Sequence, residues 1–341
     1  MPGANGKSLK ELAGISGFSL SSVSRALDPS RAHLVKEESR LKIQSFARQY
    51  GFSINPAARR LRSAHTEIIS VLAYAPRSDR PFGHEFTSLN SRALATVERR
   101  ISEYNYEMKL HMIGDALPGP EFIDPRRTDG VLFISYHGDE YTEALDRAGI
   151  PGIFASNYID PARRDVTSVT LDWSTGHRKA VDFLMRSGVR RIAYAGPEFM
   201  TIPPRLRRAL KVETALRERG MYEPENFFVV ENYYDIRDLV SRWQPEMFDA
   251  LFCSNDVIAD WFVREFRYHG IDVPGRVRII GHDNDTLYHR GDSGIASIGL
   301  EPETMFQGAV DLLMEMVRSG KCEKGCRRIY ETDFFIRESC L

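Results

Sequence analysis

The sequence predicts a small all-helical domain followed by a two-lobed α/β core, in which parallel sheets carry helices on both faces. Helical patterns account for residues 1–53. From residue 67 onward, short apolar runs alternate with amphipathic helices, which is typical of parallel sheets. The alternation restarts after residue 166. We therefore expect two lobes, with a ligand cleft at the carboxyl ends of their strands.

The first two predicted helices form a helix-turn-helix unit. Apolar residues recur at helical spacing over Leu9–Ser16, and Gly17 suits a left-handed C-cap. Ser19 suits the N-cap of the second helix. Its apolar side would carry Val23, Ala26 and Leu27, which leaves Leu20, Ser21, Ser22, Ser24 and Arg25 outside or at the edges. Small polar side chains with one Arg suit a surface that reads a DNA groove.

A third helix is expected over Glu37–Tyr50 and a short fourth one over residues 55–62. The third would close a three-helix core with Leu41, Ile43, Phe46, Ala47 and Tyr50. In the fourth, Asn55 suits the N-cap and Pro56 the first helical position. A helix this short is unstable alone in water, so we expect it to order against a partner, namely a DNA duplex.

The core should contain alternating strands and helices. Strands are expected at residues 68–74, 106–112, 130–135, 152–155, 167–171, 191–195, 227–230, 250–253, 277–280, 295–298 and 328–336. Helices are expected at residues 84–104, 139–148, 173–186, 204–219, 257–268 and 302–318, with a short one ending at residue 243.

Charge separates the two parts of the chain. Residues 1–65 contain 11 Lys and Arg against 4 Asp and Glu, whereas the remainder contains 35 basic and 43 acidic residues. A basic module on an acidic body is typical of nucleic-acid readers, and a solvated basic helix pair is the alternative. No apolar run approaches the roughly 20 residues of a membrane span. The first residues lack the apolar core of a signal peptide, so we expect a cytoplasmic protein.

The four cysteines give little support to a metal site. Cys322 and Cys326 are four residues apart, but no second ligand pair follows them. Free thiols in a reducing compartment are the expected state. The sequence also lacks a nucleophile motif, a phosphate loop and a metal-spaced His/Asp set. We therefore predict neither a cofactor nor an enzymatic activity.

Several ordered motifs resemble those of one family. Residues 9–62 are similar to the headpiece of LacI-type (lactose and galactose repressor) transcription regulators. The matching pieces are Leu-Lys-Glu-Leu-Ala at 9–13, Val-Ser-Arg at 23–25, Tyr-Gly-Phe at 50–52, Asn-Pro at 55–56 and Ala-Arg-Arg-Leu at 58–61. The core resembles the regulatory core of the same family, which is similar to the periplasmic sugar-binding fold. The matching pieces there are 172–176, 184, 188, 191–193, 250–256, 273–274, 280–284 and 336–339.

The resemblance implies a domain plan. Residues 1–53 would be the DNA-binding headpiece, 54–66 the hinge helix and linker, and 67–341 the effector-binding and dimerisation core. The chain would cross between lobes three times. We expect the first lobe at about residues 67–165 plus 290–320, and the second at about 166–289 plus 321–341.

The resemblance also implies which headpiece residues contact DNA. Leu20 and Ser21 stand where the family selects bases, and ordinary capping is the alternative. Arg25 can bond a guanine or a phosphate, although a cation also suits the end of a helix. Leu61 would insert between base steps from the minor groove, with the alternative that it packs on the core. The expected DNA contacts are Leu20, Ser21, Ser22, Ser24, Arg25, Asn55, Ala58, Leu61 and Arg62.

Strand-end side chains are the expected effector contacts. Asp283 and Asn255 each follow a strand and can bond hydroxyls or ring nitrogens. The resemblance places the effector-binding Arg at Arg208, with Arg205 as the rival. Aromatic side chains could stack on a sugar or a base, with core packing as the alternative, and His282 is expected to be a packed core residue. The remaining expected effector contacts are Tyr74, Phe82, Ser135, Asn157 and Tyr233.

Together these features predict a ligand-responsive, sequence-specific DNA-binding regulator, expected to repress carbohydrate-related genes. Its partners would be a near-palindromic DNA operator, a small effector that is a sugar by default or else a purine, and a second copy of the chain. A dimer is favoured because no heptad tail follows the core. The alternatives are a solute-binding receptor without a DNA role, and a sugar- or nucleotide-processing enzyme.

Overall fold

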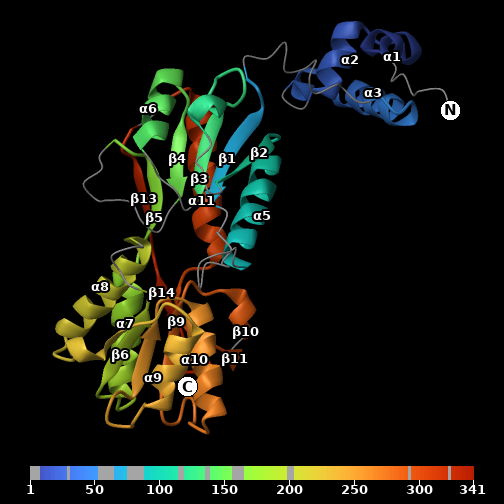
Figure 1. Cartoon of the computed structure of the whole chain (residues 1–341). Helices are drawn as coiled ribbons and strands as arrows, with labels where there is room; N and C mark the ends of the chain where they lie inside the picture. The colour runs from blue at the N-terminus through green and yellow to red at the C-terminus, as the bar shows by residue number, and fades with distance from the viewer. Residues whose placement is uncertain are drawn as a thin grey trace. The chain divides into compact units, whose positions relative to one another are not determined.

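The computed structural model describes residues 8–28, 31–52, 65–74, 88–113, 119–134, 139–155, 165–197, 203–290, 293–321 and 324–341 (Figure 1). The chain divides into two compact units, Met1–Thr66 and Glu67–Leu341. The hinge helix expected at residues 55–62 lies outside the described residues.

Within its described residues, the first unit contains three α-helices with a common core. They are α1 (Leu9–Ser16), α2 (Leu20–Leu27) and α3 (Glu37–Gln49), with a short 3-10 turn at Ala32–Leu34. Gly17 ends α1 with a φ of 72°, and the Ser19 hydroxyl caps α2 by accepting from the backbone N–H of Ser22 at 3.1 Å. Both caps confirm the predicted turn.

The headpiece core is smaller than predicted. Leu12, Val23, Ala26, Ile43 and Ala47 are its buried residues. Leu41 and Tyr50 were expected in this core, but they are 51% and 38% exposed. The prediction was wrong for both because the stripe of α3 that faces α1 and α2 is narrow: Ile43 and Ala47, four residues apart, occupy it.

In the part of the second unit that the structure describes, there are two six-stranded sheets and a two-stranded antiparallel sheet of β10 (His289–Arg290) and β11 (Ser293–Gly294). In order across the first sheet, the strands are β13 (Arg327–Glu331), β5 (Ser168–Asp172), β4 (Gly152–Ala155), β3 (Gly130–Ile134), β1 (Ile68–Tyr74) and β2 (Glu107–Ile113), all parallel. The second contains β14 (Asp333–Phe335), β12 (Ala296–Gly299), β9 (Arg278–His282), β8 (Ala250–Cys253), β6 (Ile192–Gly196) and β7 (Phe227–Val229). Only β14 among these is antiparallel to its neighbour.

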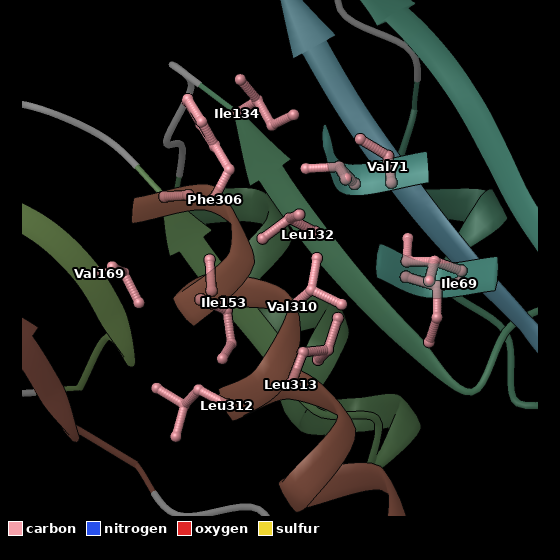
Figure 2. Close-up of a cluster of buried hydrophobic side chains, with 14 of the residues drawn as sticks. Ile69, Val71, Leu132, Ile134, Ile153, Val169, Phe306, Val310, Leu312 and Leu313 are labelled. Atoms are coloured by element: carbon pink, nitrogen blue, oxygen red, sulfur yellow. The ribbon is translucent and has the colours of Figure 1, made fainter. Parts of the chain in front are cut away.

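Helices cover both faces of each sheet. In the first lobe, α5 (Ser88–Glu103) and α11 (Pro302–Ser319) pack together on one face and α6 (Asp139–Ala148) on the other. Figure 2 shows Val310 and Leu313 of α11 against the sheet residues Leu132 and Ile153. In the second lobe, α7 (Ser174–Arg186) and α8 (Pro203–Arg217) cover one face, and α9 (Tyr233–Ser241) and α10 (Asp256–Tyr268) cover the other. This arrangement confirms the predicted fold class.

The strand predicted at residues 328–336 is in fact two strands in different sheets. β13 pairs with β5 in the first sheet, whereas β14 pairs with β12 in the second. Thr332 separates them, and its backbone N–H and hydroxyl both donate to the carbonyl of Asp172, at 3.0 and 3.1 Å. The chain also passes between sheets after β5 and after β12. All three crossings leave from carboxyl ends of parallel strands.

The predicted lobe boundaries need correction accordingly. Residues 168–172 and 327–331 belong to the first sheet, although both were assigned to the second lobe. Residues 296–299 belong to the second sheet, although they were assigned to the first lobe. An apolar run has the same period in either sheet, so the boundaries depend on long-range pairing rather than on local pattern.

The crossings are tightly packed at Gly176 of α7. A Cβ atom at this position would come within 2.6 Å of Ile298 Cγ2 and 2.7 Å of Thr332 Oγ1. We therefore expect Gly176→Ala to lower the free energy of unfolding by about 1–3 kcal/mol, the usual cost of overpacking. Chemical denaturation of the full chain measures it. Gly14→Ala is the control, because nothing lies within 4 Å of that position. Equal core stability of the two variants would contradict this packing.

Candidate functional site

The outward surface of α2 is the candidate DNA-contacting site. Leu20 is 51% exposed, and Ser21 and Arg25 are also exposed, while Val23 and Ala26 are buried against the other helices. The remaining two candidates, Ser22 and Ser24, are partly exposed. The helix therefore presents one apolar group, several hydroxyls and one cation on its free side.

The polar groups of this surface differ in how they are held. The Ser19 hydroxyl lies 3.0 Å from that of Ser21 and 2.9 Å from that of Ser22, so these side chains share the helix cap. Arg25 has no acidic partner within the described headpiece, whereas Arg31 is held by Asp28 at 2.7 Å. An unpaired guanidinium on an exposed helix surface is available for a phosphate or a base. Asn55, Ala58, Leu61 and Arg62 lie outside the described residues.

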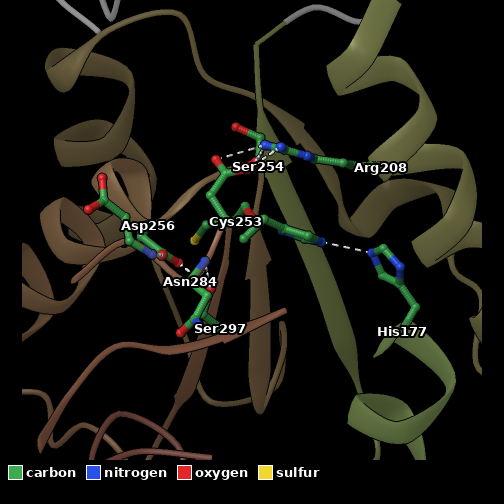
Figure 3. Close-up of polar contacts among 10 residues, drawn as sticks. His177, Arg208, Cys253, Ser254, Asp256, Asn284 and Ser297 are labelled. Carbon is green, nitrogen blue, oxygen red and sulfur yellow. Dashed lines mark hydrogen bonds and ion pairs between the residues drawn. The ribbon is translucent and has the colours of Figure 1, made fainter. Parts of the chain in front are cut away.

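The second candidate site is a buried ion pair at the carboxyl ends of β8 and β9. Arg208 of α8 is only 5% exposed. Its Nη1 donates to Asp283 Oδ2 at 3.1 Å and to the Ser254 carbonyl at 2.8 Å, and its Nη2 donates to Asp283 Oδ1. The guanidinium lies over the ring of Trp173, 4.6 Å from its centroid. Figure 3 shows Arg208 reaching the chain at Ser254.

The backbone at Asp283 is held in an uncommon conformation. Asp283 and Asn284 have φ values of 96° and 52°, in the left-handed region that side chains disfavour. Gly299 of β12 makes room for them, since a Cβ there would come within 2.9 Å of the Asn284 Cβ and the Asp283 carbonyl carbon. The Asp283 N–H donates to the Ile298 carbonyl at 2.9 Å. Strain of this kind persists only where surrounding bonds hold it, and it is frequent at ligand sites.

Buried polar side chains hold the rest of this loop. Asp256 accepts from the Ser297 hydroxyl and from the Asp285 N–H, each at 2.7 Å. Its full burial raises the pKa of its carboxyl well above the usual range. Arg337 donates to Asn284 Oδ1 at 2.5 Å. The sequence analysis missed Asp256 and Arg337 as supports of the site. Their presence within motifs shared with the family was the one signal.

The remaining predicted effector residues have varied positions. Asn255 is buried, and its side chain caps α10 by accepting from the Ile258 N–H at 2.9 Å. The Tyr233 hydroxyl donates to Glu265, and its ring packs against Trp261. Neither of these contacts involves Arg208. Tyr74 ends β1, but its side chain, like that of Arg205, lies outside the described residues. Phe82, Ser135 and Asn157 lie outside them entirely.

Two histidines whose contact was not predicted from the sequence lie next to residues of this site: His282 directly precedes Asp283, and His177 contacts the backbone of Trp173. His177 Nε2 and His282 Nε2 are 2.8 Å apart, and both residues are fully buried. Each Nδ1 lies 2.6 Å from a carbonyl oxygen, that of Trp173 for His177 and that of Cys253 for His282. Burial lowers the pKa of His177 to about 4 and that of His282 well below the ordinary value. The prediction that His282 is a packed residue is confirmed.

Two further findings concern the described residues. No helix among them is long and apolar enough to cross a membrane. Within the same part of the chain, no group of three or more His, Cys, Asp or Glu side chains is placed to hold a metal ion.

Comparison with known proteins gives full-length relatives. A family model described as a periplasmic binding protein-like domain matches residues 181–340. The HTH-type transcriptional regulator CelR of Thermobifida fusca is 26% identical, over 97% of both chains. The HTH-type transcriptional repressor CytR of Escherichia coli K12 is 25% identical, over 97% of this chain and 95% of its own.

Solved structures agree on the fold. The lac repressor dimer bound to operator superposes with a TM-score of 0.73 at 16% identity, covering 99% of this chain and 100% of that one. A CelR–cellobiose complex superposes with a TM-score of 0.66 at 21% identity, covering 98% and 99%. Similarity at this level of identity establishes the architecture of this chain and does not identify its ligand.

The buried ion pair should be strongly coupled. We expect Arg208→Met and Asp283→Asn each to destabilise the core by about 3–5 kcal/mol, because each leaves a partly desolvated group without its partner. The double variant should lose clearly less than the sum. Urea denaturation of the four proteins measures this coupling. The control cycle is Arg264→Met with Asp260→Asn, a pair on the surface of α10 expected to contribute about 0.2–1 kcal/mol. Additive losses at Arg208 and Asp283 would disprove the coupling.

Proposed function

We propose that the chain is a member of the LacI-type family of DNA-binding transcription regulators, and that it works as a homodimeric repressor whose affinity for an operator is set by a small molecule. The proposal rests on one observation: the same chain has an exposed surface of small polar side chains on α2 and a buried Arg208–Asp283 ion pair. The first suits a duplex and the second a polar ligand.

The headpiece supports sequence-specific binding of DNA. A helix with one exposed Leu, several hydroxyls and an unpaired Arg offers apolar contact to a thymine methyl and a bidentate donor to guanine. The excess of basic over acidic residues in the first 65 positions would add phosphate contacts that position the helix. In a dimer the two headpieces would read the two halves of a near-palindromic site.

The ion pair supports recognition of a carbohydrate. The Arg208 fork and the Asp283 carboxylate together offer donors and acceptors in a water-poor setting, which suits neighbouring hydroxyls of a sugar. A solved complex of the regulator CelR contains cellobiose. We therefore propose a sugar as effector, with Arg208 as its clamp rather than Arg205, and Tyr74, Phe82, Ser135, Asn157, Tyr233 and Asn255 as its possible neighbours.

Effector binding would act on DNA through the three chain crossings. A ligand held at the carboxyl ends of β8 and β9 would lie at the edge of the second sheet that the crossing after β12 leaves and that the crossings after β5 and β13 reach. A change in the angle between lobes would move the two hinge segments at residues 54–66 closer together or farther apart. Paired, they would fold in the minor groove, with Leu61 of each copy as the wedge. Such coupling is typically worth about 1–3 kcal/mol.

A solute-binding receptor remains the second candidate, since the core alone fits one. The α2 surface and the basic headpiece favour the regulator, because a receptor has no use for them. A regulator of this kind would act in the cytoplasm, where its operator is. One measurement distinguishes the two functions: a regulator should bind specific duplexes with an affinity that falls as salt rises, and a receptor should not.

Arg25 should matter for the operator and not for the effector. With an operator selected from random duplexes, we expect Arg25→Ala to weaken binding by about 10- to 100-fold, the usual value of one good base contact. Electrophoretic mobility shift at fixed salt measures it. Lys42→Ala on α3 is the control, because that Lys is exposed and paired with Glu38 at 2.8 Å. Full operator affinity in the Arg25 variant would rule out α2 as the reading helix.

Arg208 should control the effector response. In a thermal-shift screen of sugars, including cellobiose, and of purine nucleosides, we expect at least one sugar to raise the Tm of the full chain. A ligand at 100 times its Kd adds about 2.7 kcal/mol of stability. Arg208→Lys keeps the charge but loses the fork, so it should reduce the shift, while Arg264→Lys should keep it. A response to purines alone would replace the sugar assignment, and no response in either class would refute it.

A further inference from the structure

The two imidazole rings of the buried histidine pair make three close polar contacts. His177 comes from α7 and His282 from the end of β9, 105 residues apart in sequence. The three contacts are the two Nδ1–carbonyl distances of 2.6 Å and the Nε2–Nε2 distance of 2.8 Å. In Figure 3 this contact is the dashed line that reaches the labelled ring of His177.

The number of protons that these contacts need exceeds what two neutral rings carry. A carbonyl oxygen only accepts, so each Nδ1 must carry a proton to make its bond. The Nε2–Nε2 contact needs one further proton. Three protons on two imidazoles make one positive charge, whereas a neutral pair has only two protons. One of the three contacts is therefore without a proton whenever the pair is neutral.

We propose that His177 and His282 are a proton-sharing pair that positions the Arg208–Asp283 site and takes up a single proton in acid. His282 directly precedes Asp283, and the carbonyl that His177 binds belongs to Trp173, the residue on which Arg208 rests. The rings of His282 and Trp173 are also in T-shaped contact, with their centroids 5.7 Å apart. Movement of either imidazole would thus shift a group that holds Arg208. The description of that ion pair as the effector site rests on the proposed function.

The surroundings determine when the proton is taken up. Arg208 and Lys211 of α8 oppose an added positive charge, and Asp172 at the end of β5 favours it. On β8, burial keeps the Cys253 thiol protonated by raising its pKa, and Asp283 is engaged with Arg208. Burial and the two cations prevail, so uptake occurs below the ordinary range of histidine. A second proton would place two hydrogens in the Nε2–Nε2 contact, so the pair titrates in one step.

The linkage to stability has a definite sign. In the unfolded chain both histidines protonate near pH 6.5. In the folded chain burial lowers the pKa of His177 to about 4 and that of His282 well below its ordinary value. The stability that the neutral pair contributes is therefore complete above pH 6.5, and it is lost as the pH falls from 6.5 toward 4.

The test is nitrogen-15 NMR of the full chain labelled at histidine, without DNA or ligand, so that it is independent of the proposed function. At pH 7.5 we expect one ring protonated at Nδ1 and the other at Nε2, with a scalar coupling between the two Nε2 atoms across their shared hydrogen. The assignments come from His177→Asn and His282→Asn, and each should abolish the coupling. His33→Asn, which removes an exposed histidine of the headpiece, is the control and should leave it unchanged.

Acid titration of the same sample completes the test. The Nδ1 atom that lacks a proton at pH 7.5 should take one up in a single step below pH 6.5. In each single variant the remaining ring already satisfies its carbonyl with its one proton, so the step should move to lower pH or leave the folded range. Two rings both protonated at Nδ1 at pH 7.5, or two rings that titrate independently near 6.5, would overturn the inference. The parent protein alone decides this even if a variant fails to fold.

Discussion

Burying the charge of Arg208 is the constraint on which the organisation of the second lobe depends. A guanidinium that is 5% exposed needs a counter-charge and acceptors for its donors, or the cost of desolvation is not recovered. Asp283, the Ser254 carbonyl and the face of Trp173 supply them. Each of these comes from the end of a strand or the start of a helix at the same edge. The positive φ at Asp283 and the lack of a side chain at Gly299 follow from that requirement.

The same edge is where the chain passes between lobes. Trp173 is the first residue after β5, so the surface beneath Arg208 is attached directly to a crossing. Thr332, on another crossing, bonds twice to the carbonyl of Asp172 and so ties two of the three passages together. A ligand that altered the Arg208–Asp283 pair would therefore act, under the proposed function, on the segments that connect the two sheets. The contacts of Trp173 and Thr332 would be enough to link the ion pair to the crossings.

Features that depend on neighbouring residues could be predicted from the sequence, whereas features that depend on residues far apart in the chain could not. Caps such as Gly17 and Ser19, and the strands and helices of the core, depend on local pattern, and the structure has them within a few residues of the expected bounds. The strand predicted at 328–336 was wrong because an apolar run gives no sign of changing its sheet at Thr332. The histidine pair was missed for the same reason, since its members are 105 residues apart. Arg208 was predicted as an effector contact from the family resemblance. The structure shows that its side chain is buried, and its role with an effector stays a proposal.

The position of α11 also bears on how the chain acquires its shape on the ribosome. Residues 302–319 supply Phe306, Val310 and Leu313 to the interior of the lobe that residues 68–172 begin. That interior cannot close until nearly the entire polypeptide has been synthesised. The other lobe has five of its six strands once residue 299 has emerged. The second lobe, although translated later, is therefore able to fold first. The apolar surface of the first lobe stays exposed until α11 has been synthesised, which makes it a surface that chaperones could bind.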